Sequence, residues 1–295
     1  FKQKTAYEML RSLVGSEMCI RDRHEHLDLT LHLDERTRRG FAPGLDLDYH
    51  GTNVAGVLRG YYLNDNEPRD DFDVAANKQL PTNRYRLQWQ HKQTVPGNVD
   101  ITANINKLSD PDILEDFFYR EFQKEREPES VVDITKRGET YTLSLLARPQ
   151  FNNFFAEVER LPELRLAVNR TRLGRTRLFY EGETTAGYYK NEPGDTGDAL
   201  FTGESARMDS FHQVVMPAWL FDWLSVVPRA GVRGSFYENS PDRNDLWRVA
   251  CDLGVETSFK MWRTWNNAQC RWLQVDGLRH VLEPFADYQW VPKPN

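Results

Sequence analysis

Three histidines near one end of the chain have the spacing of a candidate metal site. His24, His26 and His32 are separated by even numbers of residues, so in a β-strand their side chains would point to one face. Imidazole nitrogens gathered on one face could bind zinc. No further histidine supports the set, and Cys19 belongs to the atypical segment described below. We therefore expect these histidines to line a hydrated face, and we predict no metal and no cofactor.

Carboxylate pairs separated by two residues could supply the acid and base of a glycosidase. The clearest pairs are Asp46 with Asp48, Glu157 with Glu159, and Glu181 with Glu183. In a strand both members of such a pair lie on the same face, which a hydrated wall explains without catalysis. The sequence contains no glycine-rich phosphate loop, no G-x-S-x-G elbow and no H-E-x-x-H motif. We therefore predict that the protein is not an enzyme.

Cysteine content and net charge exclude two further classes. The three cysteines are irregularly spaced, which rules out a disulfide scaffold and a zinc-finger pattern. Cys251 and Cys270 are expected to lie beyond the roughly 7 Å between Cα atoms that a bridge requires. The net charge is −6 and no basic patch dominates, so we predict no nucleic-acid partner.

The elements that carry these residues are predicted to be β-strands. Apolar and polar residues alternate strictly along most of the chain from His24 onward, which is typical of strands with one apolar and one wet face. The clearest runs are residues 27–33, 45–49, 85–90, 99–106, 141–145, 164–168 and 249–259. We count about 13 such strands, most of them longer than the usual soluble strand of about 5–6 residues. Strands that cross a bilayer with a tilt need about 9–11 residues.

The polar faces carry many charged residues, which the interior of a β-sandwich could not bury without a large desolvation cost. The connections add a second argument, because long polar ones collect at one end of the meander and short turns at the other. The long ones cover residues 64–83, 109–138, 191–205 and 238–245; the short ones cover 37–40, 51–53, 94–97, 149–152 and 173–175, of which 37–40 falls on the long-loop end. Within the longest connection, residues 111–124 have an apolar stripe and predict a short helix capped by Asp110.

We therefore predict an all-β fold, an antiparallel transmembrane β-barrel fragment that forms an open, curled half-barrel. Aromatic residues near the predicted strand ends fit the interface girdles of such barrels. They are Tyr61, Tyr62, Tyr188, Tyr189, Trp219, Trp223, Trp262 and Trp290. A soluble antiparallel β-sandwich with core aromatics is the alternative that the pattern leaves open.

The first 23 residues differ from the rest of the chain. The stretch FKQKTAYEMLRSLVGSEMCIRDR lacks the alternating pattern and resembles translated sequencing-adapter read-through. An amphipathic helix is the alternative, because Tyr7, Leu10 and Val14 have helical spacing. We expect residues 1–23 to be a non-native segment and residues 24–295 to be one partial barrel domain. Both ends of the chain look cut, so the missing signal peptide does not bear on localisation.

Several runs, in order and spacing, resemble the LptD (OstA, organic solvent tolerance) family of lipopolysaccharide-assembly proteins. The runs are Arg39-Gly40, Gly56 to Asp65, Tyr85 to His91, Asp100 to Asn106, Leu108 to Asp112 with Asp116-Phe117-Phe118, Leu161 to Leu164, and Arg279 to Pro284 with Tyr288 and Val291-Pro292. Each run alone is weakly specific. Together they span nearly all of residues 24–295.

The resemblance implies export without catalysis in the Gram-negative outer membrane. Lipopolysaccharide would arrive over a periplasmic LptA-like bridge through a missing N-terminal domain. It would leave sideways through a seam between the first and last strands, while an LptE-like lipoprotein plugs the lumen and membrane lipids surround the barrel. The family barrel has about twice the strands counted here, so gate residues cannot be placed, and neither Cys251 nor Cys270 matches a family cysteine.

An amphiphile with a large sugar head needs a wide, wet lumen. The predicted lumen wall consists of polar residues on the wet faces of the strands. They are Arg84, Arg86, Asp100, Asn104, Arg177, Glu181, Arg229 and Arg233. Two other functions stay open, a different outer-membrane pore or transporter and a soluble carbohydrate-binding β-sandwich.

Overall fold

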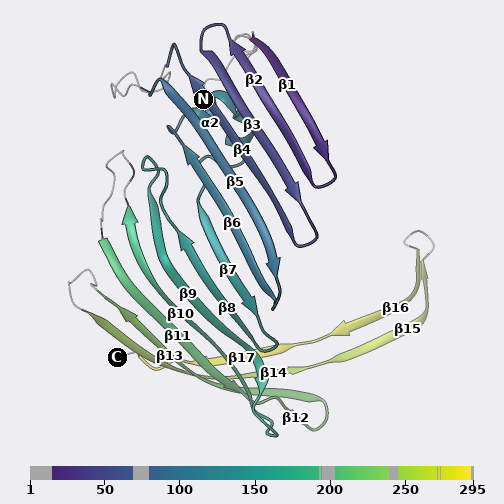
Figure 1. Cartoon of the computed structure of the whole chain (residues 1–295). Coiled ribbons are helices and arrows are strands. Elements are labelled where there is room, and N and C mark those ends of the chain that lie inside the picture. Colours follow the sequence, from purple (N-terminus) through teal and green to yellow (C-terminus); the bar gives the residue numbers. More distant parts are fainter. Residues whose placement is uncertain are drawn as a thin grey trace, which may run out of the picture. The chain divides into compact units, whose positions relative to one another are not determined.

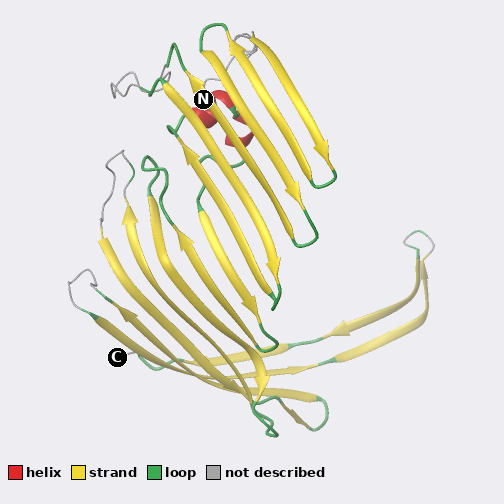
Figure 2. Ribbon diagram, viewed as in Figure 1, coloured by secondary structure: helices red, strands yellow, loops and turns green. Residues whose placement is uncertain are grey.

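The computed structural model describes residues 15–68, 80–192, 194, 203–238, 245–270, 272 and 274–293. Within these ranges the chain is almost entirely β-strand, with two short helices in one connection (Figures 1 and 2). None of the helices in these ranges is long and apolar enough to cross a membrane. Most of the segment expected to be non-native, residues 1–14, lies outside the described residues. Its remainder forms a strand, so the structure leaves that prediction untested.

The strands pair antiparallel in chain order and the order stays open, with β1 at one end and β17 at the other. This confirms the predicted fold class. The strands from the first part of the chain are β1 (Gly15–His24), β2 (Leu27–Arg36), β3 (Gly40–His50), β4 (Val54–Asn64), β5 (Asn83–Val95), β6 (Val99–Leu108), β7 (Val131–Arg137) and β8 (Tyr141–Arg148). The later strands are β9 (Glu157–Arg172), β10 (Phe179–Glu192), β11 (Gly203–Val215), β12 (Ala218–Leu220), β13 (Leu224–Tyr237), β14 (Leu246–Phe259), β15 (Met261–Cys270), β16 (Val275–Leu282) and β17 (Phe285–Trp290).

The last four strands make one long hairpin. β14 pairs with β17 and β15 pairs with β16 in the same register, since Ser258 faces Phe285 and Met261 faces Leu282. Between the two ladders the Phe259 N–H donates to the Pro284 carbonyl at 3.3 Å. β15 is therefore the continuation of β14, and β16 leads into β17, so the predicted meander holds to the end of the described chain.

The longest connection differs from its prediction in two ways. Residues 131–137, which we assigned to it, form β7 and pair with β6. The predicted helix over residues 111–124 forms as two pieces, α2 (Ile113–Phe117) and α3 (Tyr119–Phe122), because Phe118 leaves the helical conformation at φ −129° and ψ 46°. The N-cap is Asp112, whose side chain makes no capping hydrogen bond.

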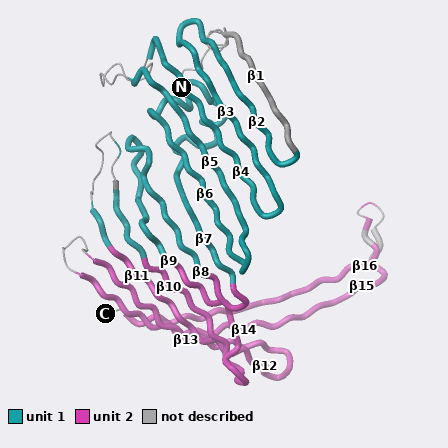
Figure 3. The backbone as a smooth tube through the Cα atoms, in the orientation of Figure 1, with its two compact units in different colours: residues 1–137, 143–164, 187–205 teal, residues 138–142, 165–186, 206–295 magenta. Residues whose placement is uncertain are grey.

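Two compact units divide the described chain (Figure 3). Unit 1 comprises residues 1–137, 143–164 and 187–205, and unit 2 comprises residues 138–142, 165–186 and 206–295. Unit 1 contains a small apolar core where the helical connection meets the sheet. Leu108, Ile113, Leu114 and Phe155 are buried there, and partly buried phenylalanines pack against them. This core attaches α2 to the end of β6 and to the β8–β9 connection.

Candidate functional site

The strand register gives unit 1 one polar and one apolar face. Residues directly opposite each other on paired strands lie on the same face. Arg86 faces Tyr61 on β4 and Gln90 faces Asn104 on β6, whereas Leu87 faces Gly60 and Trp89 faces Ile105 and Leu58. The even-numbered residues of β5 therefore belong to the polar face and the odd-numbered ones, up to Trp89, to the apolar face.

The apolar face of unit 1 is exposed although it carries large hydrophobic side chains. Leu87 is 43% exposed and Phe41 is 54% exposed. Soluble domains rarely expose a continuous apolar face of this size, and such a face marks contact with a protein or a lipid. The exposed members on this face are Leu27, Leu31, Phe41, Tyr62, Tyr85, Leu87, Trp89 and Ile134.

A hydrogen-bonded aromatic cluster lies on this apolar face. The Tyr49 hydroxyl lies 2.7 Å from Nδ1 of His91 and accepts the Trp89 indole N–H at 3.0 Å. Gly56 pairs with Tyr49, and a Cβ at Gly56 would lie 2.3 Å from the Tyr49 ring carbon Cζ. The missing side chain at Gly56 lets the tyrosine ring lie flat over β4, so the polar atoms of the cluster satisfy one another within an apolar surface.

The polar face of unit 1 has a buried arginine at its loop end. The Arg84 side chain is fully buried, and its guanidinium donates to both oxygens of Asp110, at 3.0 Å from Nε and 2.7 Å from Nη2. Nη1 donates to Asp116 at 2.5 Å and lies 3.5 Å from Asp65. Asp65 also accepts from Arg39 at 2.7 Å. Each charge in this cluster has an opposite charge beside it, which is the condition under which charges can be buried.

A second arginine reaches the same helical connection. Arg86 is 5% exposed and donates to Glu121 of α3 at 2.5 Å. Its guanidinium carbon lies 4.1 Å from the centre of the Phe118 ring. The guanidinium carbon of Arg84 lies 5.0 Å from the centre of the Phe117 ring, which is the geometry of a cation–π contact. Arg84 and Arg86 therefore lie on the predicted wall face, but the connection between β6 and β7 covers both.

The other predicted wall residues of unit 1 lie farther along the same face. Asp100 forms an ion pair with Arg137 and accepts from the Thr94 hydroxyl at 2.7 Å. Asn104 donates its amide to the Glu129 carbonyl at 3.4 Å. The structure therefore brings Asp100 and Asn104 onto one surface with Arg84 and Arg86, as the register requires.

In unit 2 the predicted wall residues Glu181 and Arg233 form ion pairs that are more exposed to solvent. Glu181 accepts from Arg170 at 2.8 and 3.2 Å. Arg233, whose side chain is 58% exposed, donates to Asp209 of β11 at 3.0–3.2 Å. Arg177 is the one predicted wall residue outside a strand, because it lies exposed in the turn between β9 and β10.

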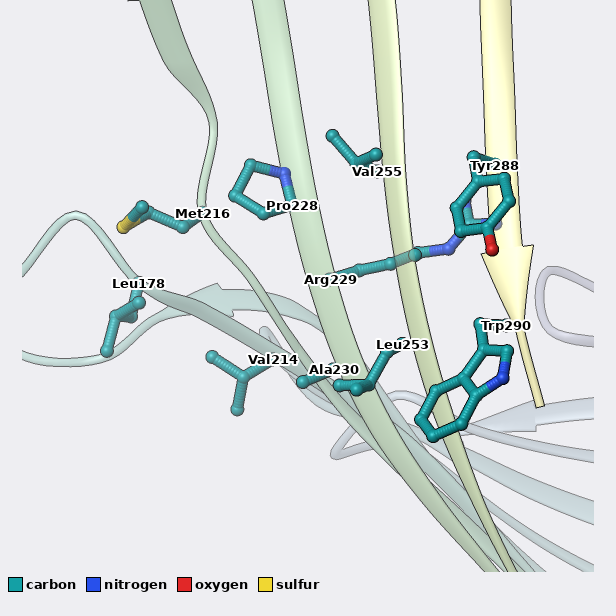
Figure 4. Close-up of a pocket in the computed structure, with 11 residues that line it drawn as sticks. Leu178, Val214, Met216, Pro228, Arg229, Ala230, Leu253, Val255, Tyr288 and Trp290 are labelled. Carbon is teal, nitrogen blue, oxygen red and sulfur yellow. The ribbon is translucent and has the colours of Figure 1, made fainter. Parts of the chain in front are cut away.

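Arg229 connects three strands of unit 2. It belongs to β13, pairs with Gly254 of β14, and donates to Asp287 of β17 at 3.0 Å. A Cβ at Gly254 would lie 2.6 Å from the Arg229 Nε, so only a glycine lets the side chain pass over β14. Figure 4 shows Arg229 extending from its strand toward the strand of Tyr288.

The apolar face of unit 2 holds an open groove of about 750 Å³ (Figure 4). Val214, Ala230 and Leu253 lie on this face, as do Tyr288 and Trp290 of β17. Trp247, Val249 and Val232 continue the same face along β13 and β14, exposed by 67%, 49% and 50%. Unit 2 therefore repeats the two-faced pattern of unit 1.

Of the three histidines considered for a metal site, His26 and His32 contact neighbouring side chains, and the side chain of His24 lies outside the described residues. His32 lies 3.0 Å from Asp46 across β2 and β3, and the His26 ring packs edge-on against His50 at 5.9 Å. Cys251 is a free, exposed thiol on the apolar face of β14. Among the described residues no group of three or more metal-ligating side chains comes together.

The sequence analysis did not identify the carboxylates that cover the predicted wall residue Arg84. Asp110 and Asp116 come from the connection, and Asp65 follows β4, so alternation could not place them beside Arg84. Tyr61 was expected at a membrane interface, yet it lies on the polar face, with its ring 5.1 Å from Phe118. The apolar stripe of residues 113–118 could have indicated the covering, because its phenylalanines are expected to pack against another part of the protein.

Comparison with known proteins gives one family. The family model described as LptD, LPS transport system D, matches residues 82–295. A protein of Ralstonia nicotianae named LPS-assembly protein LptD is 25% identical over 293 residues, which covers 90% of this chain and 32% of that protein. Proteins of the same name from Pseudomonas fluorescens and Pseudomonas putida are 26% and 28% identical over 40% and 41% of this chain, and 12% and 13% of their own lengths. The chain thus spans about a third of the length of the first of these relatives.

Proposed function

The chain belongs to the LptD family, and we therefore propose that it is part of the translocon that transports lipopolysaccharide to the outer leaflet of the Gram-negative outer membrane. The role is non-enzymatic transport and assembly. Lipopolysaccharide is the substrate, an LptE-like lipoprotein and an LptA-like periplasmic bridge are the protein partners, and membrane lipids contact the outside. Residues 24–295 form the partial barrel domain, and residues 1–23 are a non-native addition.

One observation carries the proposal, the exposed apolar face that lies opposite a charged face in each unit. In water an exposed face of leucine, phenylalanine and tryptophan is unfavourable by roughly 25 cal/mol per Å² of apolar surface. In a bilayer the same face lies in its preferred solvent, and the alternation of lipid-facing and water-facing residues is the pattern of membrane barrels. The charged face then provides the wet surface for a sugar headgroup.

On this proposal the predicted wall residues have distinct parts. Asp100, Asn104, Glu181, Arg229 and Arg233 would meet the hydrophilic portion of the lipid, since their strands place them on the charged faces. The hydrogen-bonded cluster of Tyr49, Trp89 and His91 would lie toward the lipid, where a polar group without a partner is costly. The soluble β-sandwich alternative would need a second sheet over the apolar face, and the open strand order does not favour it.

The test uses two substitutions on one strand, made in the gene that encodes this chain and assayed in its native cell. Leu87→Arg places a charge on the apolar face, where it costs up to about 2–4 kcal/mol at the bilayer midplane. Gln90→Arg places the same charge on the polar face. We expect Leu87→Arg to reduce the protein in the washed outer-membrane fraction and the lipopolysaccharide at the cell surface, and Gln90→Arg to leave both unchanged.

Two results would contradict the proposal. One is a wild-type chain that fractionates as a water-soluble protein. The other is normal surface lipopolysaccharide after depletion of the protein, which would leave a different outer-membrane pore as the better explanation for a membrane-bound chain.

A further inference from the structure

Four arginines gather at the loop end of the polar face of unit 1, and all four come from the sheet side. Arg84 and Arg86 belong to β5, Arg36 ends β2, and Arg39 lies in the turn after it. We name them the arginine cluster. Three of them contact the ring of Phe117 in α2. The guanidinium carbons of Arg36, Arg39 and Arg84 lie 4.8, 5.7 and 5.0 Å from its centre.

The acids that neutralise this cluster come mainly from the connection between β6 and β7. Asp110 and Asp116 accept from Arg84, and Glu121 accepts from Arg86. Among the described residues, the sheet side supplies Asp65, beside Arg39 and Arg84, and Asp34, at 3.8 Å from Arg36. In the described part of the chain, these four arginines have five neighbouring carboxylates with the connection in place. Two of the five, Asp34 and Asp65, remain when the connection is left out.

The contacts have the form of anion recognition. Arg84 presents two parallel N–H groups to the two oxygens of Asp110, which is the fork geometry that arginine uses for carboxylate and phosphate alike. Donor capacity remains unused, because Nη1 of Arg86 and Nε of Arg36 are buried without a hydrogen-bond partner among the described residues. Within the part of the chain that the structure describes, the cluster therefore has more N–H donors than its carboxylates engage.

We propose that the arginine cluster is a binding site for a phosphate-bearing headgroup, and that Asp110, Asp116 and Glu121 occupy it as a built-in competitor. The connection leaves the cluster when a phosphorylated ligand takes the place of its carboxylates, and returns when the ligand departs. The identity of that ligand as a phosphorylated glycolipid rests on the proposed function. The competition between loop carboxylates and phosphate does not.

The small apolar core of unit 1 also holds the connection on the sheet, and we call it the apolar anchor. Ile113 and Leu114 are buried against Leu108 and Phe155, so the ion pairs are not its sole attachment. Displacing the acids requires α2 and α3 to move over this small core. The core keeps the carboxylates close to the arginines after release, which raises their effective concentration for rebinding.

The test measures phosphate binding by the full chain in maltoside micelles, which contain no phosphate. The probes are inorganic pyrophosphate, a water-soluble glucosamine disaccharide bisphosphate, and the acylated form of that disaccharide. The first variant combines Asp110→Asn, Asp116→Asn and Glu121→Gln. The matched control combines Glu115→Gln, Glu125→Gln and Glu127→Gln, which changes the net charge of the same connection equally, at residues for which the structure gives no ion pair with the arginine cluster.

We expect the first variant to bind all three probes about tenfold more tightly than the wild type, the factor that one charge-assisted hydrogen bond supplies. Adding Arg84→Met and Arg86→Met to it should abolish the gain. Equal tightening by the control would overturn the proposal, because the effect would then be general electrostatics. An unchanged affinity of the folded first variant would overturn it as well.

A second measurement needs no substitution and decides the matter if a variant fails to fold. Hydrogen–deuterium exchange of residues 111–124 in the wild type should rise when pyrophosphate is added, because the displaced connection loses protection. Unchanged or slower exchange at saturating pyrophosphate would overturn the proposal. In the binding experiment, a higher affinity of the first variant for pyrophosphate, with no further increase in affinity for either sugar, would identify free phosphate as the ligand. Neither result depends on whether the protein transports lipopolysaccharide.

Discussion

The ion pairs on the charged faces of the two units differ in burial, although each unit has a charged face opposite an apolar one. In unit 1 the side chain of Arg84 is fully buried under α2 and contacts three carboxylates. In unit 2 the Arg233 side chain is 58% exposed and contacts the single carboxylate of Asp209. Arginine on the charged face is thus buried in unit 1, where a connection folds over it, and solvated in unit 2, where none of the described residues covers it.

The contribution of an ion pair to stability depends on whether it is exposed or buried. An exposed pair in water gains little, because solvent screens it and two long side chains lose freedom. A buried cluster gains more from each contact but has already lost its hydration, so removing one partner leaves the others without compensation. Four substitutions test this difference between the two units.

Arg84→Met should have the largest effect. It removes the cation that Asp65, Asp110 and Asp116 share, and we expect a loss of about 3–5 kcal/mol in the free energy of unfolding. The measurement is urea unfolding of the chain in detergent micelles. A loss below that of the exposed pair in unit 2 would show that the cluster is hydrated in solution.

Ile113→Ala tests the apolar anchor of the same connection. Ile113 is fully buried, and truncating a buried isoleucine costs about 2–5 kcal/mol through lost contacts and the cavity left behind. Leu87→Ala, on an exposed position, is the control and should change the unfolding free energy far less in the same urea titration. Equal effects would mean that the anchor core does not form.

Val249→Arg extends the comparison to the apolar face of unit 2. Val249 is 49% exposed and lies on that face, while its neighbour Ala250 pairs with Arg233 on the charged face. We expect Val249→Arg to weaken insertion into lipid vesicles by up to about 2–4 kcal/mol and Ala250→Arg to have a smaller effect. If the two arginines weaken insertion equally, the face of unit 2 is not lipid-facing.

Arg233→Met should have the smallest effect. The exposed pair with Asp209 is worth about 1 kcal/mol or less, and salt should reduce it further. Urea titrations at low and high salt measure this directly. A loss comparable to that of Arg84→Met would remove the distinction between the two units.

The faces of the strands were predictable because side-chain alternation has a period of exactly two residues in any strand. Asp100, Asn104 and Arg233 accordingly lie on the charged faces, as the pattern of β6 and β13 requires. The covering of Arg84 and Arg86 was not predictable, since it depends on where a connection of more than 20 residues folds. Likewise β7 has only seven residues beside a polar stretch, so its pattern was too short to separate from the connection.

The arginine cluster also has a consequence for the order of folding. Its partners are separated along the chain by 26 positions for Arg39 and Asp65, 26 for Arg84 and Asp110, and 32 for Arg84 and Asp116. Neighbouring strands can pair as local hairpins soon after they meet, but these contacts require β4, β5 and β6 to be in register first. We therefore expect the cluster to close only after these strands have paired, so that its closure indicates a correctly assembled first part of the sheet.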